Sequence, residues 1–221
     1  MAQLTRKEFE REYGVDLLPY STSDIKIGEI MDWEGLIFQS LDFKNYTIAD
    51  VFEIPESEIV ALNNELKNVA FENASFPNMV INSGISNESD LQIPGINLNL
   101  AGKIEASKVK QFSFKGVKSK RLTGPIRRKI VKELEVLKEK NFTRYKEKIR
   151  NFLIIETLFY ATEIQIDIEK NGGLNLTAEL SAMGLSDNDL SVDNSSSTTS
   201  SYTVKNINCP FAAELVRGKQ F

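Results

Sequence analysis

Few side chains in this sequence are of the types that usually carry out catalysis. The 221 residues include no histidine and a single cysteine, Cys209, which excludes serine–histidine triads, imidazole general bases and zinc sites built from histidine and cysteine. There is no glycine-rich phosphate loop, dinucleotide-binding turn or nucleophile elbow. The 31 acidic residues leave paired carboxylates open, but none stands in a recognisable catalytic setting. We therefore expect no enzyme, no cofactor and no bound metal.

Neither a targeting signal nor a membrane-spanning helix is predicted. Residues 1–12 are charged and lack the apolar segment of a signal peptide. The most apolar segment, residues 152–161, is too short to span a bilayer and contains Glu156. A single cysteine cannot form an internal disulfide and favours a reducing compartment, so we expect a cytoplasmic protein.

Basic residues are concentrated in one stretch of the chain. Residues 103–150 contain 17 Lys and Arg against 5 Asp and Glu, a local charge of +12 in a chain whose net charge is −4. Such segregation indicates a surface for an anionic partner, either phospholipid headgroups or nucleic acid. The alternative is that much of this charge, in residues 138–150 above all, lies on the solvated face of a helix.

One stretch alternates between apolar and polar residues over an unusual length. From Ile96 to Phe114 the even positions are mostly apolar and the odd positions mostly polar, with one defect near Lys108 to Lys110. A period of two predicts a strand with one apolar face, and nineteen residues would extend about 60 Å at about 3.3 Å each. Either a bend or bulge divides the run at the defect, or the protein has long amphipathic strands of the kind that insert into membranes as hairpins.

A second alternating region follows later in the chain. It runs from Phe152 to Ile168, and Asn171-Gly172-Gly173 then predicts a hairpin turn before a return arm over residues 174–180. The polar stretch of residues 186–201 is expected to be a loop. One or two further strands, interrupted at Pro210, are predicted at the end of the chain.

Helices are predicted before and between these strands. Residues 3–13 should form a short helix that Gly14 ends, and residues 57–71 an amphipathic one. Thr123 should cap the clearest helix, whose apolar stripe is Ile126, Ile130, Leu134 and Leu137 and which Asn141 interrupts. A strand is expected over residues 36–43 and a helical turn over 47–52. The fold class predicted is α+β, a twisted antiparallel sheet of long strands with helices before and between them, in a single domain over residues 1–221.

Four short stretches, taken in order, resemble one protein family. They are Leu17-Leu18-Pro19 with Asp24-Ile25, the segment from Tyr46 to Phe52, Phe112-Ser113-Phe114 at the end of the long strand, and the segment from Pro210 to Arg217. In their residues and arrangement they resemble the gasdermin pore-forming family, in particular its small bacterial and fungal members. The resemblance covers roughly residues 17–217.

The resemblance implies a fold like that of the gasdermin N-terminal domain and a function in membrane pore formation. Family members bind acidic phospholipid membranes, oligomerise into a ring and insert β-hairpins into the bilayer, causing cell death or serving defence. The protein would then move from the cytoplasm to the inner face of the cell membrane. The residues expected to contact lipid headgroups are basic: Arg6, Lys7, Arg11, Lys108, Lys110, Lys115, Lys118, Lys120, Arg121, Arg127 and Arg128. The residues expected to face lipid after insertion are apolar members of the alternating runs: Ile96, Leu98, Leu100, Ile104, Ile164, Ile166, Leu174 and Leu176.

The sequence departs from the family pattern in two places. Bacterial relatives carry a lipidated cysteine near the N-terminus, where this chain has Ala2, Gln3 and Leu4. The relatives also keep an inhibitory tail that a protease removes, whereas this sequence ends at Phe221, four residues after Arg217. We therefore expect control by a regulatory partner chain in place of cleavage.

A second interpretation needs no membrane. The alternating runs would then form one face of a soluble sheet that packs on the helix of residues 126–137, since such stripes are usually core. The protein would be an α+β binding module whose basic segment, residues 103–150, binds nucleic acid or an acidic protein partner.

Overall fold

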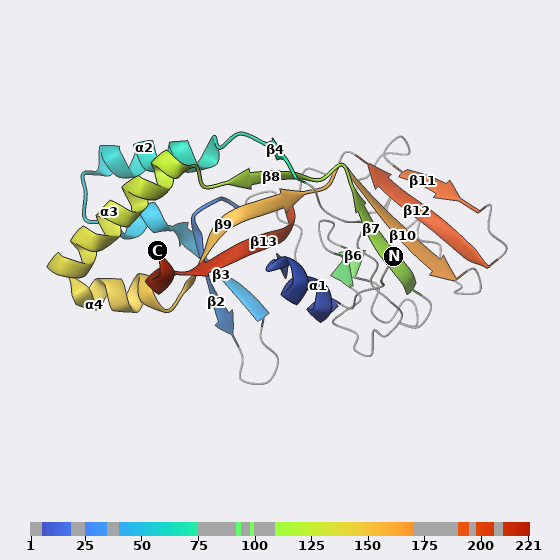
Figure 1. Ribbon diagram of the computed structural model, residues 1–221, viewed down its shortest axis with the longest axis horizontal. Helices are drawn as coiled ribbons and strands as arrows, with labels where there is room; N and C mark the ends of the chain where they lie inside the picture. Colours follow the sequence, from blue (N-terminus) through green and yellow to red (C-terminus); the bar gives the residue numbers. More distant parts are fainter. Residues whose placement is uncertain are drawn as a thin grey trace. The chain divides into compact units, whose positions relative to one another are not determined.

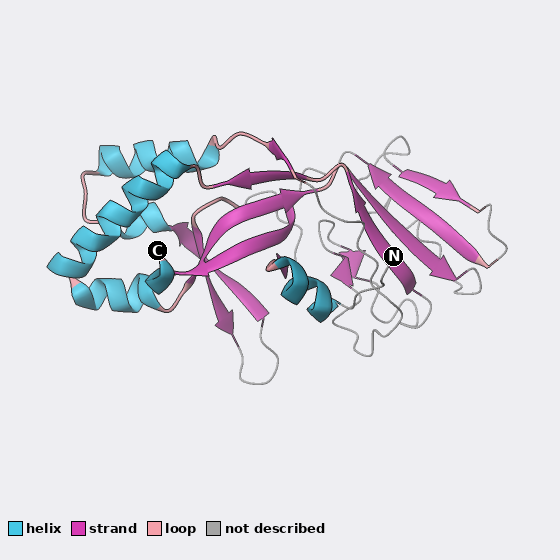
Figure 2. Cartoon of the chain, viewed as in Figure 1, coloured by secondary structure: helices cyan, strands magenta, loops and turns pink. Residues whose placement is uncertain are grey.

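Runs of strands are separated by groups of helices along the chain, and the strands pair in antiparallel sheets, so the computed structural model has an α+β fold (Figure 2). It describes residues 6–18, 25–34, 40–74, 92–93, 98–99, 109–169, 190–194, 198–205 and 210–221. Only the backbone is described for residues 6–9, 33–34, 40–43, 92–93, 98–99, 109 and 112. The predicted fold class, an antiparallel sheet structure with helices before and between the strands, is confirmed.

The chain divides into two compact units, each made of three separate segments. Unit 1 contains residues 1–23, 73–118 and 159–212, and unit 2 contains residues 24–72, 119–158 and 213–221. Neither unit is continuous in sequence, because the chain passes from one to the other five times. That all 221 residues fold as a single domain stays a prediction.

Unit 1 contains a four-stranded antiparallel sheet in the order β11-β12-β10-β7 (Figure 1). These strands are β7 (Val109–Lys115), β10 (Glu163–Glu169), β11 (Leu190–Asp193) and β12 (Thr199–Lys205). Phe114, Ile164 and Val204 lie opposite one another on three neighbouring strands, and each is fully buried. The ring of Phe114 stacks on that of Phe211, with centroids 4.1 Å apart and planes 11° apart. This apolar row is the core that the alternating pattern predicts.

Four smaller elements also belong to unit 1. They are α1 (Arg6–Tyr13), β1 (Asp16–Leu17), β5 (Gln92–Ile93) and β6 (Leu98–Asn99), of which the last two pair. The helix ends as predicted, since Gly14 follows it with φ at +64°, a conformation that glycine adopts without strain. The predicted loop over residues 186–201 is wrong in part, because β11 and the start of β12 lie within it; Leu190 and Val192 supply the alternation that a short edge strand needs.

A seven-stranded sheet supplies most of the strands of unit 2. Its order is β1-β13-β9-β2-β3, with β8 pairing β9 and β4 pairing β8. The strands not yet given are β2 (Glu29–Glu34), β3 (Ser40–Thr47), β4 (Glu72–Asn73), β8 (Lys118–Arg121), β9 (Leu153–Tyr160) and β13 (Pro210–Arg217). Seven of the eight residues of β9 are buried, so both of its faces are covered.

The second alternating region is two strands, not one. β9 ends at Tyr160 and β10 begins at Glu163, so the prediction of a continuous run from Phe152 to Ile168 is wrong. The break comes at Ala161-Thr162, where the backbone N–H of Thr162 turns to donate to the carbonyl of Lys115 at 3.0 Å. The strand expected over residues 36–43 begins only at Ser40 within the described residues, and Pro210 begins β13 as predicted, since proline is tolerated at the first residue of a strand.

Helices form the other layer of unit 2. They are the 3₁₀ turn η1 (Ile48–Val51), α2 (Glu56–Lys67), α3 (Gly124–Lys140), α4 (Phe142–Tyr145), the π-helical turn η4 (Lys146–Arg150) and the 3₁₀ turn η6 (Gly218–Gln220). In α3 the predicted stripe of Ile126, Ile130, Leu134 and Leu137 is buried throughout. Thr123 does hold the N-cap position in an extended conformation, but its side chain makes no capping hydrogen bond. Asn141 separates α3 from α4 and caps α4 by accepting from the N–H of Arg144 at 3.1 Å.

Candidate functional site

The end of the first alternating region lies beside the end of the second in unit 1. β7 and β10 are antiparallel neighbours, with Ile164 opposite Phe114 and Ile166 opposite Phe112. Ile164 and Ile166 have no exposed surface, so these two of the residues predicted to face lipid are core residues in this structure. Segments that are about fifty residues apart in the sequence are therefore already paired as strands.

The defect in the alternation near Lys108 to Lys110 is a bulge. Asp167 lies opposite Gln111, but Ile168 lies opposite Val109, so Lys110 is an extra residue on β7. A bulge near this point is thus confirmed, whereas residues 100–108, on which the choice between a divided run and one long strand depends, lie outside the described residues. The bulge leaves Lys110 half-exposed, and its Nζ pairs with the carboxylate of Glu169 at 3.0 Å.

Polar side chains on the opposite face of the same two strands are hydrogen-bonded to one another. Gln111 donates from its amide to Asp167, and Gln165 donates to the other carboxylate oxygen of Asp167 at 2.9 Å. Asp167 is buried, with 7% of its surface exposed. Because both of its oxygens accept hydrogen bonds, this buried carboxylate is compensated within the sheet.

Most of the predicted lipid-facing residues lie outside the part of the chain that the structure describes. That holds for Ile96, Leu100, Ile104, Leu174 and Leu176. Leu98 lies in β6, where only the backbone is described. The predicted turn at residues 171–173 also falls outside the described ranges.

The predicted headgroup residues are spread over several elements. Arg6, Lys7 and Arg11 lie on α1, with only Arg11 described as a side chain and exposed. Lys115 is exposed at the end of β7, Lys118 and Arg121 are exposed on β8, and Arg128 is exposed on α3. Lys108 lies outside the described residues.

Three of the predicted headgroup residues have partners within unit 2. Lys120 places its Nζ 4.7 Å from the centre of the exposed Phe71 ring, a cation–π contact. Arg121 lies 3.7 Å from a carboxylate oxygen of Glu214. Arg127 donates to Glu156 at 2.7 Å. A phosphate group would therefore compete with carboxylates for both arginines.

The Arg127–Glu156 ion pair is buried on the side of the glutamate. Glu156 lies on β9 with 9% of its side chain exposed, whereas 43% of the Arg127 side chain is exposed. The guanidinium also lies 5.3 Å from the centre of the Phe221 ring. Arg127 thus neutralises a carboxylate inside the protein, a role that the helical pattern of α3 does not reveal.

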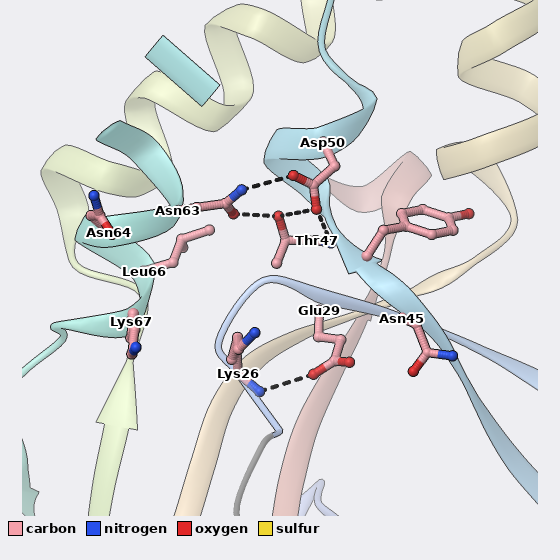
Figure 3. Close-up of a pocket in the computed structure, with 10 residues that line it drawn as sticks. Lys26, Glu29, Asn45, Thr47, Asp50, Asn63, Asn64, Leu66 and Lys67 are labelled. Carbon is pink, nitrogen blue, oxygen red and sulfur yellow. Dashed lines mark hydrogen bonds between the residues drawn. The ribbon is translucent and has the colours of Figure 1, made fainter. Parts of the chain in front are cut away.

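A polar pocket of about 250 Å³ lies between the end of β3, η1 and α2 (Figure 3). At its wall the backbone N–H of Thr47 and the amide of Asn63 each donate to Asp50 at 2.7 Å, and the hydroxyl of Thr47 donates to Asn63 at 2.6 Å. Lys26 and Lys67 also line the pocket. These hydrogen bonds join Thr47, Asp50 and Asn63 in one network, which caps η1 and links it to α2.

The ionisable side chains that line the pocket are those of Lys26, Glu29, Tyr46, Asp50 and Lys67. Burial raises the pKa of the Tyr46 hydroxyl, which also lines the pocket. The charge of Lys44 lowers this pKa and that of Asp32 raises it, and the net effect is a raised pKa. The phenol therefore stays protonated at neutral pH. No group of three or more His, Cys, Asp or Glu side chains suited to a metal ion occurs among the described residues. The Thr47-x-x-Asp50 spacing is a capping-box signal that can be read in the sequence. The sequence does not show that Asn63 hydrogen-bonds to both residues.

Comparison with known proteins gives two matches of different strength. The sequence model of the Bacterial Gasdermin Family matches residues 57–219, which is most of the chain. A solved structure of a bacterial gasdermin from Bradyrhizobium tropiciagri is similar in fold, with a TM-score of 0.55 and 15% sequence identity over 94% of this chain and 83% of that one. The search of curated proteins found no match.

The two matches cover most of the described elements. In the described part of the chain no helix is both long enough and apolar enough to cross a bilayer. The fold similarity covers both units, and the family match includes the paired strands β7 and β10 together with α3 and β13. The chain belongs to the bacterial gasdermin family.

Proposed function

We propose that this protein forms membrane pores, by oligomerising and inserting β-hairpins into membranes that contain acidic lipid, and that this activity causes cell death or serves defence. The observation that carries the proposal is the pairing of β7 with β10, which joins the two amphipathic regions of the sequence in one sheet. Membership of a family of pore-forming proteins supports it. The same membership supports the expectation that the protein is not an enzyme.

In the proposed pore the two faces of these strands would meet different environments, lipid on one side and water on the other. Ile164 and Ile166 would leave the core and face lipid tails, because a strand presents alternate side chains to opposite sides. Gln165 and Asp167 would face water in the lumen. The protein would act from the cytoplasm on the inner face of the cell membrane, and its partners would be acidic phospholipid and further copies of itself. A regulatory partner chain stays a prediction.

Dye-loaded vesicles test the activity. Purified protein, alone and with the products of neighbouring genes, is added to vesicles with and without acidic phospholipid. We expect dye release from the acidic vesicles, and weaker release at high salt because screening reduces the attraction. No dye release, together with no sedimentation of the protein with either kind of vesicle, would reject the proposal.

Single cysteines test the assignment of faces. In a Cys209→Ser background, Ile164→Cys and Gln165→Cys place a thiol on the two faces of β10. We expect Ile164→Cys to be unreactive in solution and to react with a lipid-soluble maleimide on vesicles. Gln165→Cys should react with a water-soluble maleimide in both states. If the two positions react alike on vesicles, β10 does not insert as an amphipathic strand.

A further inference from the structure

The polar pocket beside β3, η1 and α2 has a lining that suits a small polar ligand (Figure 3). Its volume is about 250 Å³, and the residues that line it all belong to unit 2. Nine of these ten residues carry polar side chains, and the tenth is Leu66. Most ligand pockets are largely apolar with a few polar groups. A ligand of this pocket would instead be polar over its whole surface.

The walls of the pocket are tied to one another. In the turn that precedes β2, the backbone N–H of Lys26 donates to the carboxylate of Glu29 at 3.0 Å. The carbonyl of Gly28 in the same turn accepts from the backbone N–H of Ile48, the first residue of η1, at 2.8 Å. Gly28 also packs against α2, since a Cβ at this position would lie 3.0 Å from a methyl carbon of Leu66. The pocket is therefore preformed, which lowers the entropy cost of binding.

The protein itself already occupies the carboxylates of the pocket. One oxygen of Asp50 accepts from the backbone N–H of Thr47 and the other accepts from the amide of Asn63, each at 2.7 Å. The carboxylate of Glu29 accepts from the backbone N–H of Lys26. A cationic ligand would have to compete with all of these donors for the same oxygens.

Several donors of the pocket remain available. The Nζ atoms of Lys26 and Lys67 have no ion-pair partner among the described residues, and both side chains are exposed. The side-chain amides of Asn45 and Asn64 have no hydrogen-bond partner in that part of the chain either. In the view of Figure 3 both lysines lie below Asp50 and its hydrogen-bond partners. The pocket thus offers two cations and two amides to a ligand.

We propose that this pocket binds a small soluble sugar phosphate. The phosphate group would accept from the ammonium groups of Lys26 and Lys67, because lysine binds phosphate as a point charge and a dianion suits two such charges. The amides of Asn45 and Asn64 would hydrogen-bond to sugar hydroxyls, which donate and accept as amides do. At about 30 Å³ for each water of the liquid, the pocket holds about eight waters, the space of a pentose or hexose monophosphate.

This binding does not depend on the proposed pore. The site lies within unit 2, outside β7 and β10, and a soluble ligand would reach it without a membrane. A ligand that binds only when the turn before β2, η1 and α2 enclose the pocket stabilises the folded state. The proposal therefore predicts a higher melting temperature in solution.

Calorimetry and thermal unfolding of the full chain measure the binding. Ribose 5-phosphate and glucose 6-phosphate are the probes, and ribose and inorganic phosphate each offer half of the proposed contacts. We expect the tighter sugar phosphate to bind with a dissociation constant of about 1 mM or below. At about 20 mM it should raise the melting temperature by about 4–7 °C. Ribose and inorganic phosphate should each bind at least about tenfold more weakly.

Substitutions in the pocket test the contacts. Lys26→Gln and Lys67→Gln should each weaken sugar phosphate binding about tenfold, because each removes a hydrogen bond to a charged group. Asn64→Ala should weaken it about fivefold through the loss of a neutral hydrogen bond. All three side chains are exposed, so the melting temperature without ligand should stay the same.

Two lysines outside the pocket serve as controls. Lys132→Gln and Lys219→Gln remove the same charge from exposed positions of unit 2, and each should change binding less than about twofold. Equal losses in the pocket and control variants would overturn the proposal, as would equal affinity for inorganic phosphate and the sugar phosphate. No binding of either sugar phosphate would also overturn it. The expected losses would uphold it whether or not the protein releases dye from vesicles, so the pocket and the pore are tested separately.

Discussion

Replacing Arg127 should destabilise the protein far more than replacing its neighbour Arg128. Arg127→Ala leaves the carboxylate of Glu156 on β9 without its partner, at a site where 9% of that side chain is exposed. Removing one member of a fully buried pair costs about 3–5 kcal/mol. Since 43% of the Arg127 side chain is in solvent, water can reach the site, and we expect about 2–3 kcal/mol.

Thermal and urea unfolding measure this difference. In a chain of this size about 1 kcal/mol shifts the melting temperature by about 2–4 °C, so Arg127→Ala should lower it by about 4–12 °C. Arg128→Ala removes an exposed arginine from the next position of α3 and should change stability by less than about 0.5 kcal/mol. The double variant Arg127→Leu with Glu156→Leu should recover most of the loss, because no charge is then left unpaired.

The same measurements separate stability from membrane binding. If Arg127→Ala and Arg128→Ala melt at the same temperature, the buried pair does not contribute as argued. A reversal of both charges would then be a clean test of headgroup contact. If the melting temperatures differ as expected, only Arg128→Glu can serve that purpose, since reversing Arg127 would also place two carboxylates side by side.

Two further predictions concern backbone strain and alkaline pH. Gly14 and Gly116 both have φ near +60°, but a Cβ at Gly116 would overlap the hydroxyl of Thr162, whereas no described atom lies within 4 Å of one at Gly14. Gly14→Ala should therefore cost about 1 kcal/mol and Gly116→Ala clearly more in urea unfolding; equal losses would contradict the steric argument. The pKa of Tyr46 is raised above 10.0 by burial, so the folded state holds this proton more tightly than the unfolded state. Its contribution is present below pH 10 and is lost as pH rises through the folded pKa, so Tyr46→Phe should unfold less steeply with pH between about 9 and 11, and an unchanged slope would contradict this.

Local patterns in the sequence predicted the elements but not the contacts that join them. The stripe of α3, from Ile126 to Leu137, follows from helical periodicity, and the bulge at Lys110 follows from a break in strand periodicity. In both cases the signal lies in neighbouring residues. The division of the second run at Ala161-Thr162 was missed because apolar residues continue through it, and only the distant carbonyl of Lys115 marks the turn.

A strand that is buried on both faces shows no clear alternation between core and solvent positions in its sequence. β9 is covered on both sides, and Glu156 interrupts the apolar series of even positions from Phe152 to Tyr160, so the alternating pattern does not show what the buried carboxylate contacts. Its partner Arg127 lies 29 residues earlier in α3, where the next two residues, Arg128 and Lys129, are exposed. An arginine could equally contact a lipid headgroup, as expected for Arg127, or neutralise a buried carboxylate, as it does here. Only its contact with Glu156 distinguishes the two roles.

The alternating pattern also cannot say which apolar environment a face will meet. Ile164 and Ile166 are core residues now, and in the proposed pore they would face lipid, which is equally apolar. Transfer between those two environments changes little, but exposing both side chains to water would cost about 3–6 kcal/mol, a large share of the stability of a typical domain. If the protein acts as proposed, β10 must therefore leave the core at the bilayer surface and not in solution.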